Sequence, residues 1–218
     1  MADVAVVDYG MGNLRSVEQA LRKVAPDADI VVSSDAGVIA RAGRVVFPGQ
    51  GAMPDCMREM DARGLRDVVI DAARNKPFLG ICIGLQMLFE HSAEGDVAGL
   101  GILRGEVVRF GHDLKDAQGN KLKVPHMGWN RVRRIERPAD ALEHPLWTGI
   151  PQDARFYFVH SYYVQPHDAG IVQAVSDYPQ PFVCAVAREN LFAVQFHPEK
   201  SAADGLKLLQ NFVRWNPV

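Results

Sequence analysis

The sequence predicts an α/β fold, a mixed and mainly parallel sheet flanked by helices. Continuous apolar runs rich in β-branched residues recur at 4–7, 30–32 and 45–47, and such runs are typical of strands buried on both faces. Between them lie segments with helical spacing of their apolar residues. Strands that alternate with helices form parallel sheets covered by helices, which is the architecture expected for this half of the chain.

The first helix is expected directly after the strand at 4–7 and the turn at 8–13. Its apolar side chains fall on one face, and Pro26 ends it because proline cannot continue a helix. These side chains are Leu14, Val17, Leu21 and Val24. Further helices are expected over 55–75 and 85–90, with a short buried strand over 77–81 between them.

Beyond about residue 100 the pattern indicates antiparallel or mixed strands. These strands are expected near 105–110, 130–135, 156–160, 182–187 and 191–196. A last helix is expected from Ser201, with Asp204 as a weak capping partner, and His126 and Trp129 are expected in a turn. Neither a repeat nor a low-complexity linker divides the sequence, so residues 1–218 are predicted to form a single domain.

Composition narrows the class of protein. Hydrophobic residues make up 48% and charged residues 23% of the 218 residues, as in soluble globular proteins. The net charge of −2 offers no global attraction to nucleic acid or an anionic membrane. We expect no membrane span, no secretory leader and, with three cysteines, no disulfide framework. These expectations favour a reducing, cytoplasmic setting.

The sequence also favours a protein without a metal or cofactor. Its seven histidines are scattered and lack the spacing of metal ligands. Gly10 and Gly12 could begin a dinucleotide fingerprint, but Arg15 stands where the third glycine is needed.

A candidate nucleophile lies in G-I-C-I-G at 80–84, between an expected buried strand and an expected helix. This pattern is the nucleophile elbow with Cys82 in place of serine. The sharp turn strains the central residue and leaves no room for side chains beside it. A helix N-terminus favours the thiolate. The alternative is a merely buried cysteine, which is the interpretation we favour for Cys56 and Cys184.

The candidate base is His197, which follows the apolar run at 191–196 in Q-F-H-P-E. A residue at the end of a buried strand lies at the sheet edge where α/β folds bind ligands. If the segment is extended, Glu199 falls on the same side as His197 and can orient the imidazole, as the third member of a triad does. Alone, this motif could equally be a surface turn.

These residues together resemble the triad (class I) glutamine amidotransferases. The resemblance rests on G-I-C-I-G-L-Q at 80–86, Q-F-H-P-E at 195–199 and the oxyanion-loop motif P-G-Q-G at 48–51. It covers nearly the whole chain and implies a flavodoxin-like three-layer sandwich. Three more segments narrow it to the glutaminase subunits of imidazole glycerol phosphate synthase: D-Y-G-M-G-N-L at 8–14, V-P-H-M-G-W-N at 124–130 and Y-F-V-H-S-Y-Y at 157–163. One departure is Gln50, where the family often has Val.

The resemblance implies a role for each matching residue. Cys82 attacks the side-chain amide of glutamine, His197 carries the proton and Glu199 holds His197. The implied oxyanion site is Gly49, Gln50, Gly51 and Ile83, and the implied substrate contacts are Gln86, Ser161 and Tyr162. The implied partner is a (β/α)₈-barrel cyclase subunit that receives ammonia through a channel. The expected interface residues are Asn13, Arg15, His126, Met127 and Trp129, although Asn13 could instead cap its helix.

Two other functions use the same fold, since fold alone does not decide activity. One is a stand-alone hydrolase with the same triad, for example a γ-glutamyl peptidase. The other is a non-catalytic binding or chaperone-like domain, against which the complete triad argues. Against the stand-alone hydrolase are the short chain and the segment 124–130.

Overall fold

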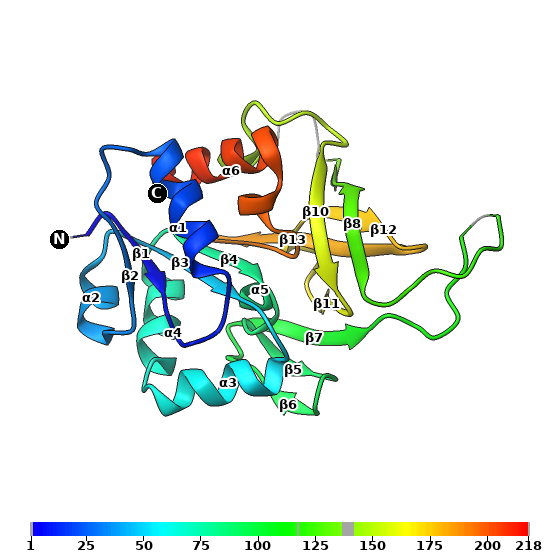
Figure 1. Ribbon diagram of the computed structural model, residues 1–218, viewed down its shortest axis with the longest axis horizontal. Coiled ribbons are helices and arrows are strands. Elements are labelled where there is room, and N and C mark those ends of the chain that lie inside the picture. The colour runs from blue at the N-terminus through cyan, green and yellow to red at the C-terminus, as the bar shows by residue number, and fades with distance from the viewer. Residues whose placement is uncertain (1, 117, 137–141, 218) are drawn as a thin grey trace.

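The computed structural model describes residues 2–116, 118–136 and 142–217 (Figure 1). The helices are α1 (Leu14–Val24), α2 (Ala36–Arg41), α3 (Met53–Ala62), α4 (Arg66–Asn75), α5 (Ile83–Gln86) and α6 (Ala202–Arg214), with 3₁₀ turns η1 (Pro145–Trp147), η2 (Ala169–Ile171) and η3 (Pro198–Lys200). The first strands are β1 (Val4–Val7), β2 (Ile30–Ser33), β3 (Arg44–Gly49), β4 (Phe78–Cys82), β5 (Phe89–Ser92), β6 (Val97–Ala98) and β7 (Leu103–Arg109). The others are β8 (His126–Arg131), β9 (Arg133–Arg134), β10 (Arg155–His160), β11 (Tyr162–Pro166), β12 (Val172–Asp177), β13 (Pro181–Arg188) and β14 (Leu191–Val194).

One large mixed sheet runs through the molecule in the order β2-β1-β3-β4-β14-β13-β11-β7-β5-β6. The strands from β2 to β14 are parallel, and β13, β11 and β7 continue the sheet antiparallel. The five parallel strands are β2, β1, β3, β4 and β14 in their order across the sheet. If β14 is counted as the fifth strand, this is the flavodoxin-like order 2-1-3-4-5. The predicted α/β class with a mixed sheet is confirmed.

Helices cover both faces of the parallel half. Figure 1 shows α1 and α6 together on one face and α2, α3 and α4 on the other. The strands between these layers are buried on both faces: every residue of β1 and of β4 is buried. Their apolar runs therefore form the centre of the core, as the sequence predicts. No helix in the described part of the chain has the length and apolar character needed to cross a bilayer.

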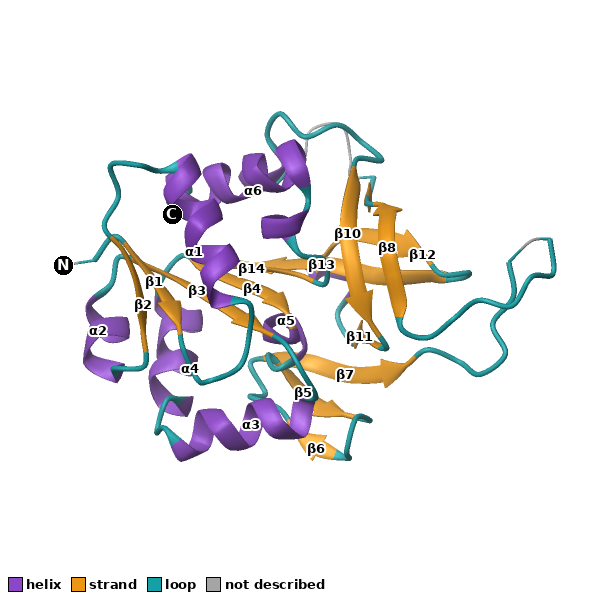
Figure 2. Ribbon diagram, viewed as in Figure 1, coloured by secondary structure: helices purple, strands orange, loops and turns teal. Residues whose placement is uncertain are grey.

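A second, two-stranded sheet of β8 and β10 stands beside the antiparallel half (Figure 2). The two strands are antiparallel, and His126 pairs with His160 at one end of the ladder. The expectation that His126 and Trp129 lie in a turn is wrong, because both belong to β8. Residues of a strand alternate between its faces, so His126 is buried while Met127 and Trp129 are exposed.

Two predicted helices differ from the structure. The helix expected over 55–75 is two helices, since Gly64 turns the chain between them with φ +65°. The helix expected over 85–90 is only the single turn of α5, and β5 follows it at once. Tertiary pairing of β5 with β7 overrides the local helical pattern there.

Two further differences concern helix starts. Helix α2 was not expected, although its N-cap Asp35 accepts a hydrogen bond from the Val38 N–H at 2.9 Å. Ser201 does not cap α6 through its side chain. Its hydroxyl donates instead to the His197 carbonyl at 2.6 Å and accepts from the Tyr157 N–H at 2.9 Å.

The close approach of α5 to β3 gives a stability prediction. A Cβ at Gly84 would overlap the carbonyl group of Phe47, which is backbone and cannot move aside. Gly84→Ala is expected to lower the free energy of unfolding by about 3 kcal/mol. The control Gly64→Ala meets no atom within 4 Å and adds only positive-φ strain, which costs about 1 kcal/mol. Urea denaturation of both variants measures the difference, and equal losses would contradict the steric account.

Candidate active site

Cys82 stands at the sharp bend between β4 and α5. Its φ of 56° and ψ of −110° are strained for a residue with a side chain. The neighbouring glycines make the bend possible: a Cβ at Gly80 would lie 3.0 Å from the Ala193 Cβ, and one at Gly84 would overlap the backbone of β3. The geometry of a nucleophile elbow predicted from 80–84 is present.

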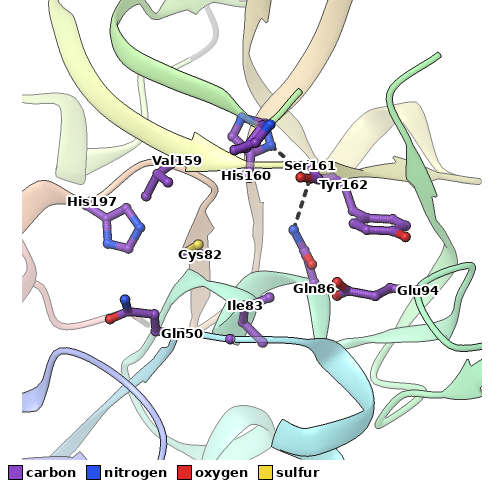
Figure 3. A pocket seen from close by; sticks show the side chains of 12 residues that line it. Gln50, Cys82, Ile83, Gln86, Glu94, Val159, His160, Ser161, Tyr162 and His197 are labelled. Carbon is purple, nitrogen blue, oxygen red and sulfur yellow. Dashed lines mark hydrogen bonds between the residues drawn. The ribbon is translucent and has the colours of Figure 1, made fainter. Parts of the chain in front are cut away.

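A cavity of about 220 Å³ opens at this bend, where β3 and β4 end. It is large enough for one amino acid and smaller than the roughly 300–1,000 Å³ typical of sites for drug-sized ligands. Cys82 and His197 both line it (Figure 3). Its other lining residues are Gln50, Gly51, Ile83, Gln86, Glu94, Pro125, Val159, His160, Ser161 and Tyr162.

Hydrogen bonds hold His197 at its backbone N–H, its carbonyl and its ring nitrogen Nδ1. Its N–H donates to the Tyr157 carbonyl at 2.9 Å, and its carbonyl accepts from the Ser201 hydroxyl. Its Nδ1 lies 2.9 Å from Oε1 of Glu199, and both side chains are almost completely buried. The pairing with Glu199 follows from the 3₁₀ turn η3 and not from an extended segment as expected.

The charges at this point favour a protonated imidazole. Burial lowers the pKa of His197, but the nearby Cys82 and Glu199 more than offset burial and raise this pKa well above its ordinary value. With Nδ1 on Glu199, Nε2 has no nitrogen or oxygen partner among the described residues. The arrangement can therefore hold a proton beside the sulfur of Cys82.

A chain of buried amides connects the sulfur with the far wall of the pocket. Gln195 donates through Nε2 to the Cys82 sulfur at 3.7 Å, and its Oε1 accepts from Nε2 of Gln86 at 3.0 Å. The same Nε2 of Gln86 donates to the Tyr162 carbonyl at 3.0 Å. Both amide protons of Gln86 are thus used, while its buried Oε1 has no partner in the described part of the chain. That oxygen is available to accept a hydrogen bond from a ligand.

The loop after β3 forms the floor beside the sulfur. Gly49 is the last residue of β3, where it pairs with Cys82, and it is buried. Gln50 and Gly51 follow it in the pocket lining, and Ile83 lies next to Gly49. The Gln50 carbonyl accepts a hydrogen bond from the Cys56 thiol at 3.6 Å.

All three cysteines are free thiols that form no disulfide. Burial raises the pKa of the Cys56 thiol to about 11 and raises the pKa of the Cys184 thiol well above its ordinary value.

The residues expected at a partner interface differ in how far they are exposed to solvent. Met127 and Trp129 are 62% and 48% exposed, whereas His126 is only 4% exposed and points inward. Arg15 is exposed at the start of α1. Asn13 precedes that helix without a side-chain capping hydrogen bond, so the alternative in which it caps α1 is wrong.

Three pocket or network residues had no role assigned from sequence. Glu94 lies in a turn that carries no recognisable motif, and its Oε2 accepts from the Met53 N–H at 2.9 Å. His160 and Gln195 stand inside quoted motifs, but their roles depend on partners distant in the chain. In the described part of the chain, no three His, Cys, Asp or Glu side chains are grouped to hold a metal ion.

Similarity to known proteins agrees with this geometry. Residues 5–215 match the family model for glutamine amidotransferase class-I. The imidazole glycerol phosphate synthase subunit HisH of Thiobacillus denitrificans is 64% identical over 99% of this chain and 92% of that protein. The protein of the same description from Aromatoleum aromaticum is also 64% identical, over the full length of both.

Solved structures show the same fold at lower identity. PurLQS from Thermotoga maritima superposes with a TM-score of 0.66 at 20% identity, covering 98% of this chain and 99% of that one. The glutaminase domain of CTPS from Trypanosoma brucei gives a TM-score of 0.64 at 18% identity, covering 100% and 96%. The chain therefore belongs to the class I glutamine amidotransferases and, within them, to the HisH subunits of imidazole glycerol phosphate synthase.

Proposed function

We propose that this enzyme subunit hydrolyses L-glutamine to glutamate and ammonia through a Cys82–His197–Glu199 triad. The observation that carries the proposal is the arrangement of two groups in one small pocket. A cysteine lies at a strained elbow, and an imidazole that is held at Nδ1 by a buried carboxylate lines the same pocket. A cysteine and an imidazole oriented by a third group form the constellation for nucleophilic catalysis.

The reaction proceeds in two halves. The Cys82 thiolate attacks the side-chain amide carbon of glutamine, and the imidazolium of His197 donates its proton to the departing ammonia. The resulting γ-glutamyl thioester is attacked by water, which gives up a proton to His197, and glutamate leaves as the thiolate is restored. The raised pKa of His197 supports this route because it favours the protonated imidazole from which the departing ammonia takes its proton.

Backbone N–H groups would stabilise the tetrahedral oxyanion. The candidates are the loop of Gly49, Gln50 and Gly51 together with Ile83, which follows the nucleophile. A single donor of this kind typically contributes about 3 kcal/mol to transition-state stabilisation.

The rest of the pocket suits the remainder of a glutamine molecule. Glu94 is the one carboxylate among the residues that line it, and Figure 3 shows it beside Gln86 and Tyr162, on the side away from His197. We infer that Glu94 binds the α-ammonium group of glutamine. The unpartnered Oε1 of Gln86 can accept a further hydrogen bond from the substrate, and residues 161 and 162 complete the wall.

The proposed partner is a (β/α)₈-barrel cyclase subunit. Support comes from the name of the 64% identical relatives, which are subunits of imidazole glycerol phosphate synthase. In this complex the ammonia would pass through a channel to the cyclase, yielding imidazole glycerol phosphate and aminoimidazole carboxamide ribotide in cytoplasmic histidine biosynthesis. Met127 and Trp129 offer an exposed apolar surface on β8 for docking. Asn13 and Arg15, at the start of α1, would add polar contacts elsewhere in the interface.

The nucleophile is tested by Cys82→Ser in the complex with the cyclase subunit. Glutamine-dependent product formation is expected to fall at least about a thousandfold, because loss of a triad member removes the covalent route. Added ammonia should still support synthesis at the wild-type rate. Cys184→Ala, which alters a buried cysteine of β13, should retain glutamine use. Glutamine turnover that survives in Cys82→Ser would eliminate this residue as the nucleophile.

The role of Glu94 is tested by Glu94→Gln, which keeps an acceptor for the Met53 N–H and removes the negative charge. The KM for glutamine is expected to rise about tenfold or more, since a hydrogen bond to a charged group contributes about 1.5–3 kcal/mol. The matched control is Glu106→Gln on the exposed side of β7. A KM unchanged from wild type would place the α-ammonium group elsewhere.

The docking surface is tested by Trp129→Ala. Removing a large aromatic side chain from an interface commonly costs about 2 kcal/mol, so the Kd for the cyclase subunit should rise about thirtyfold. Ile135→Ala serves as the control, as Ile135 is 40% exposed but lies outside the β8–β10 ladder, where its N–H donates to the Gln173 carbonyl of β12. Calorimetric titration measures both variants, and equal Kd values for Trp129→Ala and wild type would contradict the proposed surface.

A further inference from the structure

Two histidines outside the triad form a continuous hydrogen-bonded chain behind the pocket. Nδ1 of His160 lies 2.8 Å from the Tyr162 carbonyl oxygen, and Nε2 of the same ring lies 3.0 Å from Nδ1 of His126. The chain ends at Asn130, whose Nδ2 lies 3.2 Å from Nε2 of His126. It therefore joins the inner face of β8, through the end of β10, to the first residue of β11.

Both imidazoles are neutral in this environment. Their exposed fractions are 4% and 6%, and the rings of Phe110 and Phe182 pack against both of them. Burial lowers the pKa of His126 to about 4 and that of His160 to about 3. A neutral imidazole has one donor nitrogen and one acceptor nitrogen. Each ring therefore accepts a hydrogen bond from one neighbour in the chain and donates one to the other.

The two ends of the chain set that direction. A carbonyl oxygen can only accept, so Nδ1 of His160 carries its proton and Nε2 must accept from His126. At the other end, the Asn130 amide is oriented by its own contacts: Nδ2 donates to the Asp177 carbonyl at 2.9 Å, and Oδ1 accepts from the Arg131 N–H at 2.8 Å. The remaining Nδ2 proton points to His126. The Nδ1–H tautomer is consequently required in both rings.

We propose that His126 and His160 are positioning residues for glutamine, a one-way relay that holds the Tyr162 carbonyl and with it the pocket wall at residues 161 and 162. This inference rests on the proposed glutaminase function. The Tyr162 carbonyl accepts from two sides, from His160 and from Gln86, and both donors line the pocket themselves. Without the imidazole, the wall would keep the Gln86 contact alone.

Two variants of His160 separate positioning from simple packing. Asparagine places its amide where Nδ1 stands, so His160→Asn can still donate to the Tyr162 carbonyl but cannot reach His126. Glutamine reaches the position of Nε2, so His160→Gln can still accept from His126 but cannot donate to the carbonyl. Each variant loses one hydrogen bond of the relay. His160→Asn leaves the buried Nδ1–H of His126 without its acceptor, whereas in His160→Gln the Tyr162 carbonyl keeps its bond from Gln86. The variant expected to impair glutamine binding is therefore the one expected to disturb the fold less.

The measurement is steady-state kinetics of the complex with the cyclase subunit, with glutamine and with ammonia. His160→Gln is expected to raise the KM for glutamine about tenfold or more while leaving the ammonia-dependent rate unchanged. His160→Asn should stay within about threefold of the wild-type KM. Equal KM values for the two variants, or a larger increase in His160→Asn, would overturn the positioning role.

A second measurement is independent of turnover. Two-dimensional ¹⁵N–¹H NMR of the full chain with labelled histidine reports which nitrogen of each ring is protonated. The expected result is the Nδ1–H tautomer for both His126 and His160, and an Nε2–H tautomer in either ring would overturn the relay. If the wild-type complex turned over no glutamine, the proposed function and the positioning of glutamine would both fall, whereas the NMR result would still decide the hydrogen-bond direction.

Discussion

The architecture of the site depends on the bend that β4 makes at Cys82. Here the chain passes from a fully buried strand into a single helical turn that packs directly on the backbone of β3. The approach is so close that only glycine fits at position 84. This contact places the sulfur, the loop after β3 and the N–H of Ile83 at one edge of the sheet, which is where parallel α/β sheets bind ligands.

The second half of the site comes from strands that are not neighbours in sequence. β14 pairs in parallel with β4 and brings His197 to the same edge. The hydrogen bonds of Tyr157 and Ser201 then hold the backbone of His197 from either side. Because both its backbone and its ring are restrained, the imidazole of His197 keeps its orientation and has little conformational entropy to lose.

β8 has two faces with different chemistry. Met127 and Trp129 face solvent, while His126 and Asn130 belong to the hydrogen-bonded chain that ends at the pocket wall. The period of two residues along a strand is sufficient to place these two pairs of side chains on opposite faces. An aromatic cluster around the two histidines keeps them buried, and that burial favours their neutral forms.

From the sequence alone follow the α/β class, the buried parallel strands and the elbow around Cys82, because each leaves a local pattern of apolar runs and glycines. The spacing of His197 and Glu199 also predicts their pairing, although the structure brings them together through the 3₁₀ turn η3 and not through an extended segment. The split between α3 and α4 has a local cause, the positive φ of Gly64. The short α5 and the strand at His126 were decided by tertiary packing, which overrides local propensity. The contacts of Glu94, His160 and Gln195 likewise join residues far apart in the chain. No local sequence pattern predicts these hydrogen-bond partners, since hydrogen bonds between residues distant in the chain exist only after the sheet has formed.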